Sequence, residues 1–481
     1  MKMTRRDFVT DMLAGSAALA AFAPSLSRAA PLPRDAEIAV VGAGAAGIAA
    51  ARRISALGRK VVVVEASDRI GGRCVTDTTT FDVPFDRGAR WLTNVENSGI
   101  SKLARGAGMD LYPAPRGQRI RIGRRNARAG EVEDFLALQV KVNRAIAEAA
   151  RGKADISAAA ALPKDLREWA GTTDFMIGAY GTGKDLESIS ALDLATMMPR
   201  DNPSGCRQGM GALIAKLSEP LTVALSTPVT RIAWSGKDAT LETPSGSLTV
   251  KAVIVTSSTN VLLSGKMKFA PDLPKRQQDA ASRLSLGSSD RIALELPGNP
   301  LGLLRDDIVI EQSTDKRTGL LLANVGGSTL CTVDIGGSFG AEMSARGEAA
   351  MTAFAQEWLT KLFGADVASG VKRKTATRWN DMPYVLGGMS AAAVGGQPSR
   401  KVLTEPLGSL FFAGEAAHET QWGTLNGAWD SGERAADAAL RKIGALKPEP
   451  ESSQPKKKRA APRRDDAAVP EQRGLSWPRQ N

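Results

Sequence analysis

The order of apolar and polar residues predicts a strand, a helix and a second strand near the start of the chain. An apolar run at 38–41 is followed by an alanine-rich helical pattern that continues to Leu57. Gly58 ends this helix, since glycine is common directly after a helix C-terminus. The next segment, "KVVVVE", is continuously apolar, as expected for a strand buried on both faces. Residues 38–65 therefore predict a β-α-β unit of a parallel sheet.

The middle of the chain predicts further strands and two helices. "KAVIVTSS" at 251–258 reads as a strand returning to the first sheet. Apolar residues recur every three or four positions at 132–149 and at 351–362, the spacing of an amphipathic helix. The segments "DRIALELP", "DIVIE", "GLLLANV" and "TLCTVDIG" are punctuated by Gly and Pro and predict an antiparallel sheet. No repeat of fixed period is present.

Both ends of the chain differ in composition from the rest. Residues 1–29 have a basic start, a short apolar stretch and small final residues, the layout of a cleaved targeting peptide. Arg5, Arg6 and Phe8 are similar to a twin-arginine signal, which implies export to the periplasm after folding, by the twin-arginine machinery. The apolar stretch is too short to span a membrane, so no stable membrane anchor is expected. The tail at 447–481 is rich in proline and charge and is predicted to be disordered.

Charge and cysteine content exclude several classes of protein. Of the net charge of +12, residues 1–29 contribute +2 and residues 447–481 contribute +4. The other 50 basic and 44 acidic residues are well mixed, so no nucleic-acid partner is expected, and the basic tail is interpreted as a solvated segment. Three scattered cysteines do not form a disulfide framework. With a single histidine, no metal site is predicted.

Three glycines follow the first predicted strand in the spacing G-x-G-x-x-G. Between a strand and a helix, this spacing is typical of a dinucleotide-binding turn. Gly42 is expected to make the turn, Gly44 to let the backbone approach a pyrophosphate, and Gly47 to let helix and strand pack closely. Glu65 ends the second strand, where a carboxylate accepts a hydrogen bond from a ribose hydroxyl. These residues predict a Rossmann-type domain with the pyrophosphate at the helix N-terminus.

Three segments resemble the flavin monoamine oxidase family and thereby indicate the dinucleotide. "EASDRIGGR" at 65–73 and "FAGE" at 412–415 are similar to its FAD-binding segments, and "FDRGARWL" at 85–92 to its loop beside the flavin ring. The resemblance covers most of residues 36–443 in family order. It implies FAD as cofactor and an α/β, monoamine oxidase-like fold, with a Rossmann-type FAD-binding domain and a second α+β substrate domain. Ser67 stands where many members carry an arginine.

The glycine motif and the resemblance together assign a set of FAD-binding residues. In the family, the backbone at Val229 meets adenine, Glu415 meets the phosphate–ribitol region, and Thr424 lies at the flavin. The full set is Gly42, Gly44, Ala46, Gly47, Glu65, Ala66, Gly71, Gly72, Arg73, Gly88, Ala89, Arg90, Trp91, Val229, Gly414, Glu415, Thr424 and Leu425.

The resemblance also divides the chain into two interleaved domains. The FAD-binding domain is expected at 36–113, 205–270 and 398–446, and the substrate domain at 114–204 and 271–397. A ligand is expected between the two domains, against the flavin.

Four residues are interpreted as catalytic by their positions in the family pattern: Arg291, Trp379, Met389 and Thr424. Arg291 occupies the position of a lysine that holds a water against the flavin, but arginine cannot deprotonate. Trp379 begins the segment that leads to Met389, and Met389 and Thr424 stand where the family carries an aromatic pair flanking the amine. Gly388 stands where mitochondrial monoamine oxidases carry a cysteine bound to FAD, so non-covalent FAD is expected.

The resemblance implies an FAD-dependent enzyme that oxidises the C–N bond of a small-molecule amine to an imine. The hydride passes to the flavin, and the electrons pass on to dioxygen or a periplasmic cytochrome. One alternative is an amino-acid- or C–C-oxidising flavoenzyme, in which Arg90 or Arg291 could hold a carboxylate. Another is a non-catalytic FAD-containing binding protein. His418, the only histidine, is either a general base or, as we favour, a structural hydrogen-bonding residue.

Overall fold

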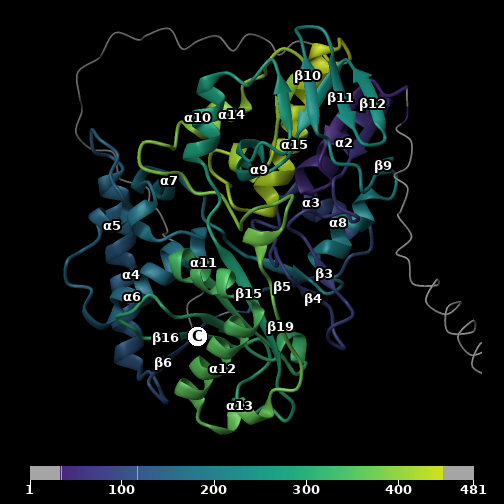
Figure 1. Cartoon of the computed structure of the whole chain (residues 1–481). Helices are drawn as coiled ribbons and strands as arrows, with labels where there is room; N and C mark the ends of the chain where they lie inside the picture. Colours follow the sequence, from purple (N-terminus) through teal and green to yellow (C-terminus); the bar gives the residue numbers. More distant parts are fainter. Residues whose placement is uncertain (1–32, 34, 116, 448–481) are drawn as a thin grey trace, which may run out of the picture.

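The computed structural model describes residues 33, 35–115 and 117–447 (Figure 1). The predicted signal peptide at 1–29 and all of the predicted tail except Lys447 lie outside the described residues.

A five-stranded parallel sheet is the centre of one half of the molecule. Its strand order is β20-β13-β1-β2-β9, and every neighbouring pair is parallel. The predicted strands at 38–41 and 60–65 and the predicted returning strand are confirmed as β1, β2 and β13. The strands are β1 (Ile38–Val41), β2 (Val61–Val64), β9 (Val223–Ala224), β13 (Ala252–Val255) and β20 (Leu410–Phe412).

Both faces of this sheet are covered. Ile38 and Val40 point to a layer of helices, whereas Ala39 and Val41 point to a four-stranded sheet of order β12-β11-β10-β14. Burial on both faces explains why these strands are continuously apolar in sequence. Figure 1 shows α2 (purple) beside α15 (yellow), although they are far apart in the chain. The covering elements are α2 (Ala45–Ala56), α3 (Gly99–Gly106), α8 (Met210–Ser218), α15 (Leu425–Lys442), β10 (Arg231–Trp234), β11 (Ala239–Thr243), β12 (Gly246–Val250) and β14 (Lys268–Ala270).

A seven-stranded sheet of order β19-β15-β18-β17-β16-β6-β7 is the centre of the other half. All four predicted strands are present as β15, β16, β17 and β18, and their pairs are antiparallel. The predicted antiparallel arrangement of these four strands is confirmed, and β6, which was not predicted, extends the sheet by pairing with β16 in parallel. The strands are β6 (Arg119–Ile122), β7 (Arg125–Asn126), β15 (Ser289–Glu295), β16 (Ile308–Glu311), β17 (Leu320–Leu322), β18 (Leu330–Gly336) and β19 (Lys374–Ala376).

Helices surround the seven-stranded sheet. The predicted helices at 132–149 and 351–362 are confirmed as α4 (Ala129–Ala149) and α12 (Glu348–Phe363). A π-helical segment, Asp174–Tyr180, follows α6 and ends beside the cavity described below. The other helices and short strands are α5 (Ala158–Ala161), α6 (Ala170–Thr173), α7 (Ala191–Thr196), α9 (Thr259–Leu263), α10 (Lys275–Arg283), α11 (Gly337–Arg346), α13 (Asp366–Gly370), α14 (Ser399–Thr404), β3 (Thr76–Asp77), β4 (Phe85–Asp86), β5 (Leu111–Pro113) and β8 (Ser204–Cys206).

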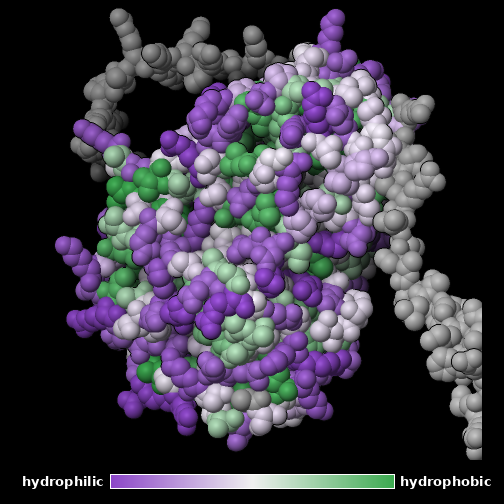
Figure 2. Space-filling view, in the orientation of Figure 1, coloured by the Kyte–Doolittle hydropathy of each residue, from purple (hydrophilic) through white to green (hydrophobic). Residues whose placement is uncertain are grey.

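The outer surface is mainly polar. Figure 2 shows hydrophilic side chains over most of the visible face, with apolar residues in small, separate patches. Within the described part of the chain, no helix combines the length and the apolar character that crossing a membrane requires.

Candidate active site

A cavity of about 1510 Å³ is lined by residues from both halves of the molecule. Its first part, here called the dinucleotide end, is lined by Gly42, Gly44, Glu65, Gly71 and Gly72. Its second part, here called the chamber end, is lined by Tyr180, Arg200, Arg291, Met389 and Thr424. A large cavity between two layers of structure is the usual position of a cofactor and its substrate.

The turn between β1 and α2 has the geometry that the glycine spacing predicts. Gly42 has a φ of 107°, a conformation that residues with a Cβ rarely adopt. A Cβ at position 47 would stand 1.9 Å from the carbonyl oxygen of Gly42, so only glycine permits this packing of helix and strand. A Cβ at position 44 would meet only the Gly72 Cα at 3.8 Å and the Gly71 oxygen at 4.0 Å. A side chain at position 44 would therefore leave the fold undisturbed, but it would occupy space in the cavity that a ligand needs.

Glu65 organises the dinucleotide end through the backbone. One carboxylate oxygen accepts from the Ala43 amide at 2.6 Å, and the other accepts from the Ser67 amide at 2.8 Å and the Ser67 hydroxyl at 2.7 Å. The side chain thus ties the end of β2 to the turn that precedes α2. This role in the turn was not foreseen from sequence, where Glu65 was expected only to bind a ribose.

Arg73 and Glu415, both assigned to the FAD site, form an ion pair with an N–O distance of 2.9 Å. Arg73 also donates to the carbonyl oxygen of Gly388, and Glu415 accepts from the Ser390 hydroxyl and the Gly423 amide. Burial alone raises the pKa of Glu415, but Arg73 and Ser390 outweigh this and hold the pKa below its usual value. An ionised Glu415 therefore joins three segments that line the cavity.

All but one of the FAD-site residues assigned from sequence line this cavity. Gly47 is the exception, as its packing role requires. The residues that line the cavity are Gly42, Gly44, Ala46, Glu65, Ala66, Gly71, Gly72, Arg73, Gly88, Ala89, Arg90, Trp91, Val229, Gly414, Glu415, Thr424 and Leu425.

Arg291 also lines the cavity, but it is held by the protein. Its Nε and Nη2 donate to the two Asp334 oxygens at 2.6 and 3.3 Å, and its Nη1 donates to the carbonyl oxygens of Asp86 and Gly88 at 2.6 and 2.9 Å. Four of its five N–H groups are therefore used. Arg90 lies 3.8 Å from the same Asp334 carboxylate and donates to Thr332.

The three other residues interpreted as catalytic line the chamber end or its border. The Trp379 indole donates to the Arg87 carbonyl oxygen at 3.2 Å. The Thr424 hydroxyl caps α15, because it accepts from the Gly427 amide and donates to the Gln421 carbonyl oxygen. Met389 offers only a thioether, so neither position that flanks the amine in the family presents an aromatic ring here.

Sequence reasoning missed three residues of the chamber end: Tyr180, Arg200 and Asp334. Tyr180 ends the π-helical segment, Arg200 follows α7, and Asp334 lies within β18. No motif marks them, since each comes from a different segment. Only the alternation of "TLCTVDIG", which places one acidic residue among buried neighbours, offered a signal for Asp334.

His418 and four aromatic residues near the site have distinct environments. The His418 Nδ1 accepts from the backbone amides of Thr420 and Gln421, which supports the structural role favoured above. Burial, with help from nearby arginines, lowers the pKa of His418 to about 4. Of the four aromatic residues, Trp91 and Tyr384 line the cavity, whereas Trp422 and Trp429 are fully buried in the core.

Comparison with known proteins gives the family. The sequence profile described as flavin containing amine oxidoreductase matches residues 45–440, most of the chain. The chain belongs to the flavin-containing amine oxidoreductase family. It is similar to rice polyamine oxidase 4 (25% identity, 87% of this chain and 91% of the relative) and to human lysine-specific histone demethylase 2 (23% identity, 84% of this chain). The chain spans only 54% of the length of the demethylase.

Solved structures of the family confirm the predicted fold. Cyclohexylamine oxidase from Brevibacterium oxydans IH-35A superposes with a TM-score of 0.72 at 20% identity, covering 85% of this chain and 100% of the other. Putrescine oxidase bound to putrescine gives a TM-score of 0.71 at 20% identity, covering 84% and 99%. The monoamine oxidase-like α/β fold inferred from sequence is therefore confirmed.

Family membership implies a flavin cofactor, and the dinucleotide end fits one. The first amides of α2 have no acceptor within the helix, and they face the cavity beside Gly44, as a pyrophosphate requires. No side chain occupies the space at position 44. Gly71 and Gly72 bring a second stretch of backbone to the same place. Glu65, the glycine turns and the Gly88–Trp91 loop line the cavity where they would hold the dinucleotide.

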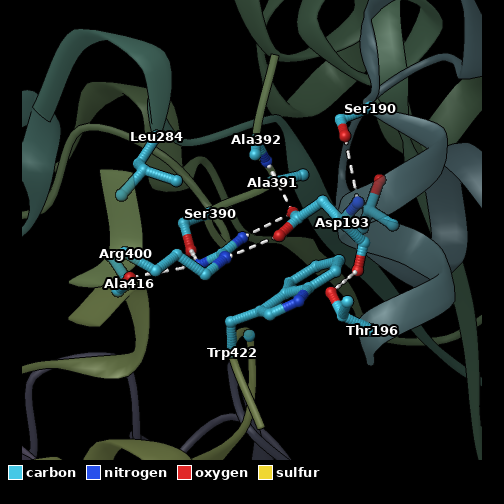
Figure 3. A network of polar contacts seen from close by, with 12 residues as sticks. Ser190, Asp193, Thr196, Leu284, Ser390, Ala391, Ala392, Arg400, Ala416 and Trp422 are labelled. Carbon is cyan, nitrogen blue, oxygen red and sulfur yellow. Dashed lines mark hydrogen bonds and ion pairs between the residues drawn. The ribbon is translucent and has the colours of Figure 1, made fainter. Parts of the chain in front are cut away.

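A buried ion pair supports the chamber wall (Figure 3). Arg400 donates to both oxygens of Asp193 at 2.7 Å, and neither side chain is exposed. The guanidinium lies over the Trp422 ring, 4.5 Å from its centroid. A third donor of Arg400 reaches the Ser390 hydroxyl, which in turn donates to Glu415. The pair thus links α7 and α14 to two segments of the cavity wall.

Proposed function

We propose that this protein is an FAD-dependent enzyme that oxidises the C–N bond of an amine to an imine, which water then hydrolyses. When bound, the flavin accepts the hydride from the carbon next to nitrogen, while the nitrogen loses a proton. The names of the relatives, polyamine oxidase and cyclohexylamine oxidase among them, support an amine as substrate. The observation that carries the proposal is a single cavity that joins a dinucleotide cradle to a chamber large enough for a substrate.

The chain's own residues position and enclose the substrate. Met389 and Tyr180 supply apolar surface, and the buried Arg400–Asp193 pair fixes the wall behind Trp422. The test is anaerobic reduction of the holoenzyme with a panel of amines, followed by flavin absorbance. Bleaching by at least one amine is expected. If the panel includes aminocarboxylates and no member reduces a protein with full FAD content, the protein would instead be a C–C-oxidising flavoenzyme or a non-catalytic flavoprotein.

We also propose that FAD is held non-covalently. Gly388 offers no nucleophile. Among the described residues that line the cavity, Cys74 is the one cysteine. Burial raises the pKa of the Cys74 thiol to about 12, which leaves almost no thiolate to attack a flavin. Acid precipitation should release all yellow colour into the supernatant, and flavin retained in the pellet would contradict the proposal.

For the electron acceptor, we propose dioxygen or a periplasmic electron carrier such as a cytochrome, with the carrier preferred. Arg291 keeps a positive charge near the Gly88 loop, but Asp334 and two carbonyl groups leave it one free N–H, less than a mobile lysine offers. Stopped-flow reoxidation in air should be slow and should be faster in Arg291→Lys. Fast reoxidation of the native protein would contradict this assignment.

We propose that the folded protein is exported to the periplasm by the twin-arginine route, on the basis of residues 1–29 alone. An Arg5→Lys/Arg6→Lys double substitution should leave holoprotein in the cytoplasm, because twin-arginine export depends on both arginines. Equal periplasmic yield from the double variant would contradict the proposal.

A further inference from the structure

We propose that the substrate amine also carries a carboxylate, and that Arg200 binds this carboxylate at the chamber end. The inference rests on the proposed amine oxidation and specifies its class of substrate: amino acids or other aminocarboxylates rather than simple amines or polyamines.

Arg200 presents a guanidinium whose hydrogen-bonding capacity is mostly unused. Its Nη1 donates to the Gly181 carbonyl oxygen at 3.2 Å, and its Nη2 donates to the Trp422 carbonyl oxygen at 3.4 Å, both long contacts. Its Nε is buried and has no hydrogen-bond partner. Guanidinium groups bind carboxylates through two parallel N–H donors, and each Nη of Arg200, with one long contact, keeps a second N–H for such a ligand.

Arg200 lies where the substrate is expected. A Cβ at position 423 would stand 3.2 Å from Arg200 Nη2 and 3.3 Å from the sulfur of Met389. The guanidinium and the thioether are therefore neighbours at the turn that leads to Thr424. Met389 and Thr424 occupy the two positions that flank the amine in the family, so a carboxylate on Arg200 would belong to the same molecule as that amine.

No carboxylate of the described chain forms an ion pair with Arg200. The nearby acids have other partners: Glu415 pairs with Arg73, and Asp334 pairs with Arg291 and Arg90. Burial lowers the pKa of Arg200, but a guanidinium stays protonated in proteins. Arg200 lines the cavity with the charge of Glu415 nearby but without an ion-pair partner of its own, so an anionic group of the substrate could pair with it directly.

The charge around Tyr180 selects against a cationic substrate. The charged side chains that act on its phenol are Asp334, Arg90, Arg291 and Arg200, three cations and one anion. A diamine would bring two more positive charges to this wall, whereas an aminocarboxylate brings a complementary anion. Arg90 and Arg291 already share Asp334, so Arg200 is the cation left to pair with the substrate.

Anaerobic reduction of the holoenzyme with matched pairs tests the substrate class. One pair is phenylalanine and phenethylamine, and the other is γ-aminobutyrate and propylamine, which places the carboxylate farther from the amine. The aminocarboxylate of at least one pair should reduce the flavin at least about tenfold more efficiently than its partner, a difference of about 1.4 kcal/mol. Amines that reduce the flavin as well as, or better than, both aminocarboxylates would overturn the inference and leave the proposed function standing.

A binding experiment tests Arg200 without catalysis. Phenylpropanoate, which has no amine, should perturb the flavin spectrum, and Arg200→Met should weaken its binding roughly 10- to 150-fold, the loss expected for one charged hydrogen bond. Arg200→Lys should retain part of the affinity and guards against a variant that fails to fold. Arg317→Met, which removes a surface arginine paired with Glu342, is the matched control and should change nothing.

The outcomes separate the two claims. Phenylpropanoate bound with equal affinity by native protein and a folded, FAD-loaded Arg200→Met or Arg200→Lys variant would overturn the inference. Arg200-dependent binding of phenylpropanoate, together with no reduction by any amine or aminocarboxylate, would overturn the proposed function and leave the carboxylate site standing.

Discussion

The dinucleotide end of the cavity is built mainly from backbone, whereas the chamber end is built from side chains. At the dinucleotide end, glycines and the first turn of α2 line the space, and Glu65 acts by accepting from backbone amides. At the chamber end, Arg200, Tyr180 and Met389 come from three separate segments. The two ends are also stabilised differently, the first by close packing at Gly47 and the second by the buried Arg400–Asp193 pair.

This contrast shows which part of the molecule is general and which is particular to this chain. A backbone cradle can bind the same dinucleotide with many different sequences, because amides do not depend on residue type. A chamber lined by side chains changes its ligand with one substitution. The cofactor therefore follows from the fold, and the substrate follows from a few residues such as Arg200.

Breaking the buried pair should have the largest effect. Asp193→Ala removes both carboxylate oxygens that accept from Arg400 and the acceptor of the Ala392 amide, leaving a buried charge unpaired. A loss of about 3–5 kcal/mol in the free energy of unfolding is expected, measured by urea titration of the holoprotein. The Asp193→Leu/Arg400→Met double variant should be closer to native. A double variant as unstable as the single one would mean that the pair itself, rather than the orphaned charge, carries the stability.

Two alanine substitutions one helical turn apart separate folding from cofactor binding. Gly47→Ala places a Cβ against the Gly42 carbonyl oxygen and should cost about 3 kcal/mol or more of stability. Gly44→Ala meets no close atom, so the stability of the FAD-free protein should stay within about 1 kcal/mol. The affinity for FAD should nevertheless fall at least about tenfold in Gly44→Ala. Thermal unfolding without FAD measures the stability, and FAD titration measures the affinity. If both substitutions lower stability and affinity equally, Gly44 and Gly47 do not have separate roles.

The same contrast explains how much could be predicted from sequence. The β1–α2–β2 unit and its glycine turn could be predicted because strand, turn and helix leave local patterns of apolar residues and glycines. The other residues assigned to the FAD site came from the resemblance to the family, and they line the cavity. Arg200 and Tyr180 left no such pattern, because their proximity depends on how distant segments pack. The parallel pairing of β6 with β16 was missed for the same reason, since 119–122 and 308–311 are remote in the chain.

Alignment gave the positions of side chains at the chamber end but not their partners. Arg291 does line the cavity, yet its ion pair with Asp334 could not be anticipated without the register of β15 against β18, which places the two residues opposite each other. Thr424 similarly lies at the cavity, but the hydroxyl is committed to capping α15. For Arg291 and Thr424 the position at the cavity was therefore predictable, whereas the hydrogen-bond partners of each side chain were not.

Glu65→Ala distinguishes a structural from a ligand-binding role at the dinucleotide end. The substitution removes the acceptors of the Ala43 and Ser67 amides, so the FAD-free protein should lose about 1.5–3 kcal/mol of stability. Ser67→Ala, which removes only the hydroxyl donor, should cost less. Urea unfolding with and without FAD gives both quantities. If Glu65→Ala weakens FAD binding while FAD-free stability is unchanged, Glu65 serves the ribose and not the turn.

The effect that is smallest at neutral pH, and that grows only in acid, is the titration of His418 beside the chamber wall. Its pKa is about 4 in the folded protein, where burial disfavours the charged ring, against an ordinary value of 6.5. Below pH 6.5 the unfolded chain takes up a proton that the native state does not, so stability is lost as the pH falls from 6.5 to about 4.

His418→Asn keeps an acceptor for the Thr420 and Gln421 amides but cannot protonate in this range. The unfolding free energy of the variant minus that of the native protein should be constant above pH 6.5 and should rise below it. Taking this difference cancels the opposite contribution of Asp86 and Asp290, whose pKa values burial raises to about 6. A difference that stays constant down to pH 4 would mean that His418 takes up its proton near pH 6.5 in the native state as in the unfolded chain, and its ring would then be available for proton transfer after all.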